Sequence, residues 1–361
     1  MGKNFRILML LCTIAVVFYI SFFLKGSGDN SINIEAVQVY LLDEDAEDDL
    51  PEGEEENLQF LVDLTPMLDK PVDFQQNYGE DVIFFTETSS TGRVHVRAVC
   101  TLEAASSLNP KTQIFLVFSQ QVQVISLTRN PALAELLKRA QNVHMVTVNN
   151  HQVIKDTPLE GVFTTELAKS PTPNEHLSDF LRLGLLWKLG GTYMDLDLLT
   201  FKSLLPIVRL KNFLTADTED KINTSMLGFQ RNHPFLMFIM ETSREQYNPF
   251  AYSIVPYSFN VATREYFNMS VGEVLTRGQI SDVSFLNKSV ISPVVYDESL
   301  DLYSGNRKVG LVDKLLENSF GVHMWGSKSS KLKMKLQSKA PYVVLAKKFC
   351  PHALKHTPRY F

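Results

Sequence analysis

The sequence of 361 residues lacks internal repeats, and its main part lacks a strong excess of either charge. The net charge of −5 comes from the N-terminal region: residues 1–57 carry 3 basic and 12 acidic side chains, which leaves 32 basic and 28 acidic ones in residues 58–361. So small a positive excess suits anionic ligands but is too weak to indicate nucleic-acid binding. Without repeats, residues 58–361 are long enough for one large domain or two small ones.

Cysteine is also scarce. Of three cysteines, Cys12 lies in an apolar N-terminal run, so Cys100 and Cys350 are the remaining candidates for a bridge. In an oxidising compartment we expect these two to form a disulfide, although spacing alone leaves two inert buried thiols as an alternative.

The apolar run, residues 7–24, is 18 residues long without a charge and is bounded by Lys3, Arg6 and Lys25. This is just long enough to cross a bilayer. The run ends in Phe-Phe-Leu-Lys and lacks the small-residue site of a cleaved signal peptide, which favours a retained transmembrane anchor. The flanking charges predict a cytosolic tail at residues 1–6 and a lumenal or extracellular location for everything after the anchor.

Residues 25–77 are predicted to form an acidic flexible stem. Within them, residues 43–56 hold ten acidic side chains in fourteen positions, and such a run repels itself and buries little. Calcium buffering is the less common alternative. The folded lumenal domain is expected at residues 78–361, where the glycosylation triplets at Asn223, Asn268 and Asn287 agree with a secretory address.

Apolar runs and amphipathic stretches alternate in this domain. We predict strands at 82–86, 112–118, 143–148, 211–215 and 226–229, and helices at 96–108, 131–140, 235–244 and around 263–267. Alternation of this kind predicts an α/β fold with a mainly parallel sheet covered by helices. Ligands of such sheets lie beyond the carboxyl ends of the strands.

Residues 190–197, Gly-Gly-Thr-Tyr-Met-Asp-Leu-Asp, carry the clearest chemical signal. They follow a helix expected at 175–189, which the glycine pair ends. On a short strand Asp195 and Asp197 would share one face, while Met194 and Leu196 point into the core. Two adjacent carboxylates repel unless a cation lies between them, and a hard ion such as Mn²⁺ or Mg²⁺ leaves positions open for phosphate oxygens. The motif thus indicates a nucleotide diphosphate held through a metal.

Two other segments add candidate residues. Asp179 and Arg182 lie one turn apart on the preceding helix, where they form either an exposed ion pair of little energy or part of the site. In the second case Arg182 offsets metal-site charge and Asp179 accepts protons from sugar hydroxyls. Residues 320–330 are expected to form a loop that folds over a ligand, and His323 in that loop is either a metal ligand or structural.

The order of these motifs resembles glycosyltransferase family 32, and within it the lactosylceramide 4-α-galactosyltransferase group: Ser178-Asp179-x-x-Arg182, Gly190-Gly191-x-Tyr193-x-Asp195-x-Asp197 and Val322-His323-x-Trp325. The likeness covers nearly the whole lumenal part. It implies a GT-A fold, which is a Rossmann-like mixed sheet flanked by helices, here behind an N-terminal transmembrane helix. Nucleotide-binding and acceptor-binding halves would form one continuous domain.

The resemblance also implies a metal centre and a reaction. Asp195 and Asp197 would hold Mn²⁺, with His323 as a further metal or phosphate contact, while Asp179 and Arg182 would contact the donor sugar. Members of the family retain the anomeric configuration of a UDP-sugar. No nucleophile can be named from these residues.

The same resemblance places the nucleotide. Phe85, Thr86 and Glu87 would line the uridine pocket, and Trp325 would belong to a C-terminal segment that closes over the diphosphate. Asn223 fits an asparagine near the donor, so we expect its glycosylation triplet to stay unused because a glycan would obstruct the pocket.

The expected function is a Golgi type II membrane glycosyltransferase that moves galactose or N-acetylgalactosamine from its UDP-sugar, in α-1,4 linkage, to a glycosphingolipid. Other Golgi glycosyltransferases are the expected partners. One alternative is an α-1,4-N-acetylglucosaminyltransferase acting on glycoprotein glycans. Another is a nucleotide-sugar-binding pseudoenzyme that assists an active relative. An aspartyl-phosphate phosphatase is disfavoured, because its Asp-x-Asp motif follows an N-terminal strand whereas this one lies mid-chain.

The sequence departs from the resembled group at one place. A glycine-proline pair is usual there shortly before a Thr-Arg, and Ser258-Phe259 occupy the stretch in this chain. Because glycine permits a close backbone approach that phenylalanine does not, we expect a reshaped substrate pocket. This departure is the support for the pseudoenzyme alternative.

Overall fold

A computed structural model describes residues 58–89, 91–119, 122–252, 255–305, 310–357 and 360–361. The predicted anchor at residues 7–24 and the acidic run at 43–56 lie outside the described residues. Within the described ranges no helix is both long enough and apolar enough to cross a bilayer. The described residues from Leu58 to Phe361 belong to one compact unit.

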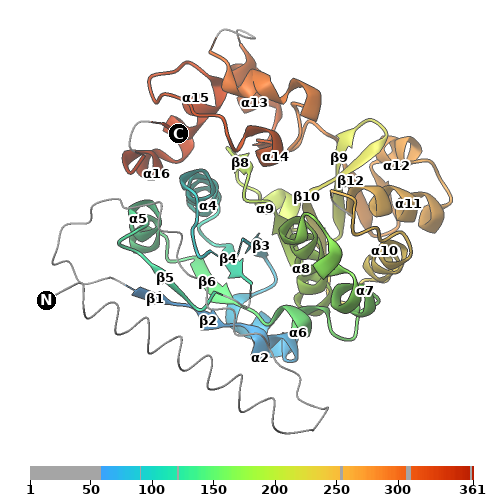
Figure 1. The fold of residues 1–361 in the computed structure, drawn as a ribbon. Helices are drawn as coiled ribbons and strands as arrows, with labels where there is room; N and C mark the ends of the chain where they lie inside the picture. The colour runs from blue at the N-terminus through green and yellow to red at the C-terminus, as the bar shows by residue number, and fades with distance from the viewer. Residues whose placement is uncertain (1–57, 90, 120–121, 253–254, 306–309, 358–359) are drawn as a thin grey trace, which may run out of the picture. The chain divides into compact units, whose positions relative to one another are not determined.

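A nine-stranded mixed sheet runs through this unit in the order β11-β12-β9-β10-β7-β3-β4-β6-β2 (Figure 1). Parallel pairing joins β2, β6, β4, β3 and β7, whereas β10 is antiparallel to both β7 and β9. β7 and β9 therefore run in the same direction, and their carboxyl ends lie at the same edge of the sheet. The strands are β2 (Val62–Asp63), β3 (Val82–Glu87), β4 (Gln113–Phe118), β6 (Val143–Thr147), β7 (Gly191–Met194), β9 (Phe213–Thr218), β10 (Lys221–Phe229), β11 (Gln279–Ile280) and β12 (Val283–Leu286).

Two hydrophobic cores cover the two faces of the sheet. In β3, Ile83 and Phe85 belong to one core, while Val82 and Phe84 belong to the other, because successive side chains of a strand point to opposite faces. A strand buried on both sides reads as a continuous apolar run, which is why residues 82–86 lack polar alternation. The mixed sheet with helices on both faces agrees with the expected GT-A type arrangement.

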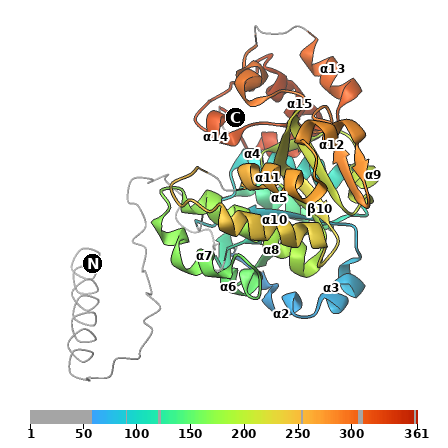
Figure 2. The same ribbon diagram turned by 90° about the vertical axis from the view of Figure 1, so that its right-hand side faces the viewer.

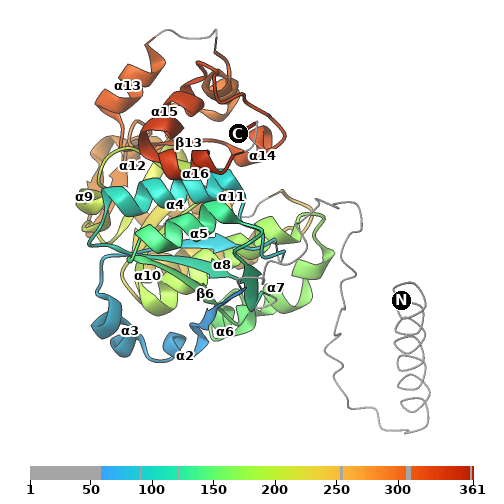
Figure 3. The same cartoon turned by 90° about the vertical axis from the view of Figure 1, so that its left-hand side faces the viewer.

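The helices divide between the faces. Figure 3 shows α4 (Val96–Leu108), α5 (Pro131–Arg139) and α16 (Pro351–Lys355) side by side over one face, where α15 (Pro341–Phe349) joins the same core. Figure 2 shows α8 (Pro173–Leu189) beside α10 (Pro234–Glu245), and α11 (Val255–Phe267) and α12 (Val271–Arg277) complete the second core. The smaller elements are β1 (Leu58–Phe60) paired with β5 (Val124–Ser126), β8 (Leu198–Thr200) paired with β13 (Gly321–His323), and α2 (Thr65–Leu68), α3 (Pro71–Tyr78), α6 (Asn150–Ile154), α7 (Glu160–Thr165), η1 (Leu167–Lys169), α9 (Leu205–Val208), η2 (Tyr296–Tyr303), α13 (Leu311–Asn318) and α14 (Gly326–Ser329).

The strands and helices predicted from periodicity each overlap an observed element of the same type. The predicted start of the folded domain needs correction, because residues 58–77 are not a flexible stem. β2 pairs with β6 in the central sheet, and Phe74 of α3 is fully buried against Phe84 and Phe115. The local composition of this stretch is too polar for its few anchoring apolar residues to stand out.

Helix α8 begins at Pro173, after Thr172 at the N-cap position, and ends at Leu189, directly before Gly190. Gly190 has φ +73°, and a Cβ there would come within 2.9 Å of the backbone nitrogen of Arg231. Glycine at this position therefore lets the chain turn directly from α8 into β7.

Cys100 and Cys350 form a disulfide with a Cα–Cα distance of 4.9 Å. The bridge links α4 to the junction between α15 and α16, and both cysteines are fully buried. The predicted bridge is confirmed, and the alternative of two inert thiols is excluded.

Ser258 and Phe259, the departure from the resembled group, lie in α11 and are fully buried. The Ser258 hydroxyl accepts a hydrogen bond from Ser243 at 2.9 Å, and Phe259 packs in the core shared by α8 and α10. Neither residue lines the cleft described below. The departure therefore contacts the helix core and not the cleft directly, and a reshaped pocket stays a prediction.

Candidate active site

A cleft of about 950 Å³ opens where β3 and β7 end. Thr86 and Glu87 at the end of β3, with Thr88 directly after it, line one side, and residues of β9 and β10 line the other. The motif carboxylates Asp195 and Asp197 lie between them. The size suits a ligand larger than a single sugar, since small-molecule pockets commonly span about 300 to 1,000 Å³.

Asp195 and Asp197 converge with His323 in this cleft. Atoms of the three side chains that could each bind a metal ion lie within 4.8 Å of one another. The carboxylates are not on a strand as predicted: β7 ends at Met194, and residues 195–197 form a turn before β8. Met194 is buried as expected, whereas Leu196 is partly buried. The turn brings both carboxylates to one place because the chain leaves the central sheet here to pair β8 with β13.

The C-terminal segment holds Asp197 from three sides. The Nε2 atom of His323 lies 3.2 Å from Asp197 Oδ1, the Gly326 N–H donates to Asp197 Oδ2 at 2.6 Å, and the Met324 N–H donates to the Asp197 carbonyl at 2.8 Å. The segment is therefore not simply the predicted loop, because it contains β13 and α14. Its strand pairing with β8 fixes His323 beside the motif.

Trp325 covers this corner of the cleft. Its ring lies over the His323 ring with centroids 4.0 Å apart, and its indole N–H donates to the Val294 carbonyl at 2.9 Å. The backbone of Trp325 has φ +53°, a left-handed conformation that costs a bulky residue roughly 1–3 kcal/mol. The contacts with His323 and Val294 hold it there.

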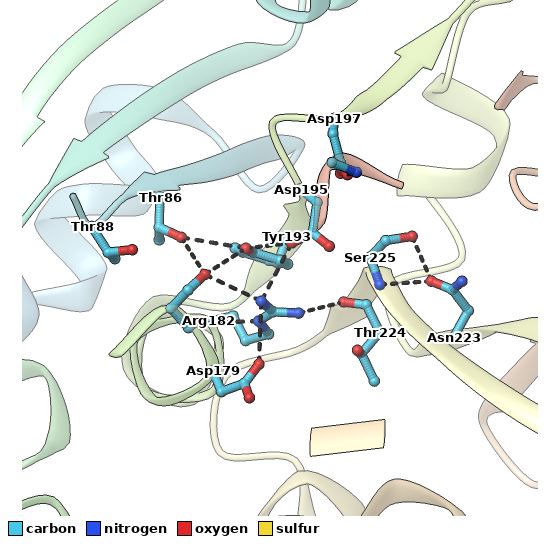
Figure 4. A network of polar contacts seen from close by, with 12 residues as sticks. Thr86, Thr88, Asp179, Arg182, Tyr193, Asp195, Asp197, Asn223, Thr224 and Ser225 are labelled. Atoms are coloured by element: carbon cyan, nitrogen blue, oxygen red, sulfur yellow. Dashed lines mark hydrogen bonds and ion pairs between the residues drawn. The ribbon is translucent and has the colours of Figure 1, made fainter. Parts of the chain in front are cut away.

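Arg182 joins the helix α8 to the motif (Figure 4). Its Nη2 atom lies 3.3 Å from Asp179 Oδ1 and 3.3 Å from Asp195 Oδ1, and its Nη1 donates to the Thr224 carbonyl at 2.9 Å. The guanidinium also stacks on Tyr193, 4.4 Å from the ring centre. Asp179 and Arg182 are buried, so the exposed ion pair considered from sequence alone is excluded.

A hydroxyl network completes this wall. The Tyr193 hydroxyl donates to Asp195 Oδ1 at 2.7 Å and lies 3.1 Å from the Ser178 hydroxyl and 3.3 Å from that of Thr86 (Figure 4). The Thr88 hydroxyl donates to the Asn174 carbonyl, which ties the end of β3 to the start of α8. Each motif residue is thus oriented by a partner on a neighbouring element.

Burial and neighbouring charges shift the pKa values of the two carboxylates in opposite directions. Burial raises the pKa of Asp195, and the charge of Asp197 adds to this against the opposing charge of Arg182. Burial works in the same direction on Asp197, but His323 and the Gly326 N–H lower the pKa of Asp197 below its ordinary value. Arg182 has a pKa above its usual range, because the surrounding acidic groups outweigh its burial. The region is a partly exposed acidic pair beside one buried permanent cation.

The predicted nucleotide residues divide into two groups. Thr86, Glu87, Asn223 and Trp325 line the cleft, but Phe85 does not. Phe85 is fully buried in the core beneath α4, since it follows Phe84 on the opposite face of β3. Its prediction as a pocket residue is corrected for this reason.

Asn223 is buried, and its amide is occupied by protein partners. Its Nδ2 donates to the Ser292 hydroxyl at 2.9 Å, and its Oδ1 accepts from the Ser225 N–H at 2.7 Å. An asparagine in this setting is inaccessible to glycosylation, in line with the expectation that this triplet stays unused.

Asp217 is a cleft residue that sequence analysis missed. It lies near the carboxyl end of β9, lines the cleft, and has a pKa raised by burial. No motif spacing marks it, because its place in the cleft depends on the pairing of β9 with β10. The run of apolar residues before it is the one signal that it follows a buried strand.

The donor set of the cluster fits a divalent cation. Two carboxylates and an imidazole suit Mn²⁺ better than a soft thiophilic ion, and the Nδ1 atom of His323 is buried without a hydrogen-bond partner among the described residues. The negative charges of Asp195 and Asp197 repel each other, and a cation bound between them would offset that repulsion. The residues present are therefore compatible with a metal centre of the kind that binds diphosphates.

Two protein-family regions match the chain. Residues 95–216 match the glycosyltransferase sugar-binding region containing the DXD motif, and residues 228–357 match the alpha 1,4-glycosyltransferase conserved region. The first contains Asp179, Arg182, Asp195 and Asp197, and the second contains His323 and Trp325. The two matches thus meet in the cleft.

Curated relatives cover a similar part of the chain. Human lactosylceramide 4-alpha-galactosyltransferase is 25% identical over 272 residues, which is 74% of this chain and 75% of the relative. Human alpha-1,4-N-acetylglucosaminyltransferase is 25% identical over 279 residues, or 76% of this chain and 79% of that protein.

Solved structures show more distant likeness. PaToxG glycosyltransferase has a TM-score of 0.39 at 13% identity, covering 56% of this chain and 79% of its own. Mouse xyloside xylosyltransferase 1 has a TM-score of 0.37 at 10% identity, covering 58% of this chain and 86% of its own. From the two matched regions and the curated relatives together, the chain belongs to glycosyltransferase family 32 and is a hexosyltransferase.

Proposed function

We propose that this hexosyltransferase is metal-dependent and retaining, and that it moves galactose or N-acetylgalactosamine from a UDP-sugar to a glycosphingolipid in α-1,4 linkage. The observation that carries the proposal is the meeting of Asp195, Asp197 and His323 in the cleft that Asp179 and Arg182 also line. Similarity to lactosylceramide 4-alpha-galactosyltransferases supports the sugar and the acceptor.

Asp195, Asp197 and His323 would hold the cation, for which we propose Mn²⁺. When bound, it would supply a Lewis acid that stabilises negative charge on the departing UDP. Arg182 holds Asp195 in place through the 3.3 Å contact and offsets part of its charge. Because Asp179 makes a contact of the same length to Arg182, its carboxylate is fixed where a sugar hydroxyl could donate to it.

The ends of the cleft would serve the two halves of the donor. Thr86 and Glu87, at the end of β3, lie where a parallel sheet usually binds a nucleoside. Trp325, stacked on His323, shields the opposite side of the cluster from water. Exclusion of water would limit hydrolysis of the donor.

We propose in addition that the protein is a single-pass type II protein of the Golgi membrane with its catalytic part in the lumen. The charge-free run at residues 7–24 and the buried disulfide between Cys100 and Cys350 support this location. A membrane anchor would keep the enzyme beside a lipid acceptor and beside other Golgi glycosyltransferases.

A second candidate is transfer of N-acetylglucosamine to glycoprotein glycans. The human alpha-1,4-N-acetylglucosaminyltransferase is as similar to this chain as the galactosyltransferases are, at 25% identity. The pseudoenzyme alternative loses its support, because Ser258 and Phe259 lie in the core.

The test uses the purified full chain in detergent with Mn²⁺. UDP release is measured for UDP-galactose, UDP-N-acetylgalactosamine and UDP-N-acetylglucosamine, each with a lactosyl glycolipid and with a glycoprotein glycan, and NMR identifies the product linkage. We expect release of UDP with the glycolipid and a new α-1,4 linkage, abolished by Asp197→Asn and retained by Asp220→Asn, which changes an exposed carboxylate outside the cleft. Preference for UDP-N-acetylglucosamine and the glycoprotein would establish the second candidate, and no turnover of any donor would refute both.

A further inference from the structure

Asp217 stands out among the cleft residues because one of its oxygen atoms is unsatisfied. Its Oδ1 is buried and has no hydrogen-bond partner among the described residues. The residue lines the cleft but is not among the three side chains of the acidic metal cluster. A buried carboxylate oxygen without a partner is costly, so its retention in a ligand cleft points to a partner that the ligand supplies.

The neighbours of Asp217 do not satisfy that oxygen. No ion pair to Asp217 occurs in the described part of the chain, and Lys288, which contributes to its electrostatic surroundings, forms an ion pair with Glu219 at 2.6 Å instead. His323 and Lys221 act on the Asp217 carboxylate through charge, and Asn223 acts on the group through a hydrogen bond, but Oδ1 itself has no partner among the described residues. Burial nevertheless dominates, and the pKa of Asp217 is raised. The group is a desolvated acceptor rather than one half of an ion pair.

The sheet places Asp217 to one side of the metal cluster. β9 and β7 are both antiparallel to β10, so their carboxyl ends lie at the same edge, two strand spacings or roughly 10 Å apart. Asp217 lies near that end of β9, and Asp195 follows directly after β7. β3, which ends in Thr86 and Glu87, lies on the other side of β7. Along this edge the proposed nucleoside side at β3 comes first, the metal cluster after β7 comes next, and Asp217 on β9 comes last.

A hexose is the part of the substrates that would extend past the metal in this direction. If the nucleoside lies at β3 and the diphosphate at Asp195 and Asp197, the sugar rings lie toward β10 and β9. A sugar presents O–H donors, and a carboxylate accepts hydrogen bonds only. The unsatisfied oxygen and the hydroxyl-rich ligand are thus complementary in chemistry as well as in position.

We propose that Asp217 is a specificity-determining residue that accepts a hydrogen bond from a hexose hydroxyl during transfer. The hydroxyl belongs either to the transferred sugar or to the terminal sugar of the acceptor. This proposal rests on the proposed transferase function. It extends that function, because it identifies the part of the cleft that distinguishes one sugar from another.

The test compares Asp217→Asn and Asp217→Ala with the matched control Asp220→Asn in the purified full chain. Asp220 lies in the same hairpin, is exposed, and accepts from the Thr218 hydroxyl at 2.6 Å. KM and kcat are measured separately for the donor and the acceptor, and UDP affinity is measured by calorimetry with Mn²⁺. Thermal unfolding identifies any variant that is merely misfolded, and the isosteric Asn variant guards against loss of fold in the Ala variant.

We expect Asp217→Ala to lower kcat/KM about 10- to 100-fold for the substrate that supplies the hydroxyl, with UDP affinity unchanged. A rise of the donor KM assigns the hydroxyl to the transferred sugar, and a rise of the acceptor KM assigns it to the acceptor. Deoxy analogues add a sharper readout: the analogue lacking the bound hydroxyl should be a poor substrate of the wild type, whereas Asp217→Ala should treat it and the parent sugar alike.

Two results would overturn the inference while leaving the transferase function intact. One is an active wild type whose Asp217 variants keep both KM values and still discriminate against every deoxy analogue. The other is loss of UDP affinity in Asp217→Asn, which would make Asp217 part of the metal and diphosphate site. Failure of the proposed function looks different, because the wild type itself would then turn over no donor.

Discussion

Arg182 is the residue on which the polar centre of the site depends. It is buried, lies 3.3 Å from both Asp179 and Asp195, and is held by the Ser178 hydroxyl and the Thr224 carbonyl. A buried ion pair contributes little net stability, but removal of one partner leaves an uncompensated buried charge. In this site it would leave Asp179 buried and unpaired, and Asp195 without its cation in a partly exposed position.

Arg182→Met should therefore destabilise the fold by about 3–5 kcal/mol, measured by chemical unfolding. The control Arg244→Met removes an exposed arginine that forms an ion pair with neighbouring Glu245, and it should cost less than about 1 kcal/mol. Adding Asp195→Asn to Arg182→Met should restore part of the loss, since it removes one unpaired charge. Equal effects of the two arginine variants would contradict this account.

Gly326 shows how closely the C-terminal segment approaches the motif. Its N–H donates to Asp197 Oδ2 at 2.6 Å, and a Cβ on this residue would lie 3.0 Å from the same oxygen. Only a residue without a side chain leaves both the hydrogen bond and the carboxylate undisturbed.

Gly326→Ala should thus displace Asp197 and weaken Mn²⁺ binding about 10- to 100-fold, the range typical when a residue that orients a metal ligand is changed. Isothermal titration with Mn²⁺ measures this effect. Gly161→Ala is the matched control, because a Cβ in α7 would meet no atom within 4 Å, and it should leave the affinity unchanged. A wild-type affinity in Gly326→Ala would show that Asp197 is not held in this way.

At the scale of elements, the pieces with strong local periodicity could be predicted. Residues 96–108 form a helix with the expected ends, and the apolar runs at 82–86 and 112–118 form neighbouring parallel strands. The turn at 195–197 could not be predicted, because alternation of Met194, Asp195 and Leu196 also suits a strand. What ends β7 is the pairing of β8 with β13, a strand more than 120 residues later, and local sequence does not reveal such a partner.

The disulfide links elements that are distant in sequence but adjacent in space. Cys100 of α4 and Cys350 close a loop spanning 250 residues, and the joined helices cover the face of the sheet opposite α8. Cross-links of native domains usually contribute about 2–5 kcal/mol, with longer loops toward the upper end.

A Cys100→Ser/Cys350→Ser variant should accordingly lose about 2–5 kcal/mol of unfolding free energy and unfold at a lower temperature. Calorimetry on the purified full chain measures the shift. Because neither Cys100 nor Cys350 lines the cleft, activity below the new melting temperature should remain. An unchanged melting temperature in the double variant would show that the bridge does not constrain the unfolded chain.

At the scale of the whole molecule, the site is a product of chain topology. Asp179, Arg182, Asp195, Asp197, His323 and Trp325 could be nominated from motifs, but their convergence within one cleft required the fold. Asp217 could not be nominated, since nothing in the spacing of β9 shows which strand it neighbours. The prediction that Phe85 lines the pocket is wrong for a related reason: neighbouring side chains along a strand point to opposite faces of the sheet, and that of Phe85 points into the core.

The convergence has one thermodynamic consequence for the complete protein. If Asp195, Asp197 and His323 hold a divalent cation that in turn holds a diphosphate, UDP affinity must depend on that cation. Any contribution of Thr86 and Glu87 to nucleoside binding would be too weak to hold UDP without it.

Calorimetric titration of UDP into the full chain, with saturating Mn²⁺ or with a chelator, tests this directly. We predict tight binding with Mn²⁺, none detectable with the chelator, and at least about a tenfold loss in Asp197→Asn but not in Asp220→Asn. UDP binding of equal strength with and without the cation, or unaltered in Asp197→Asn, would contradict a metal-dependent donor site.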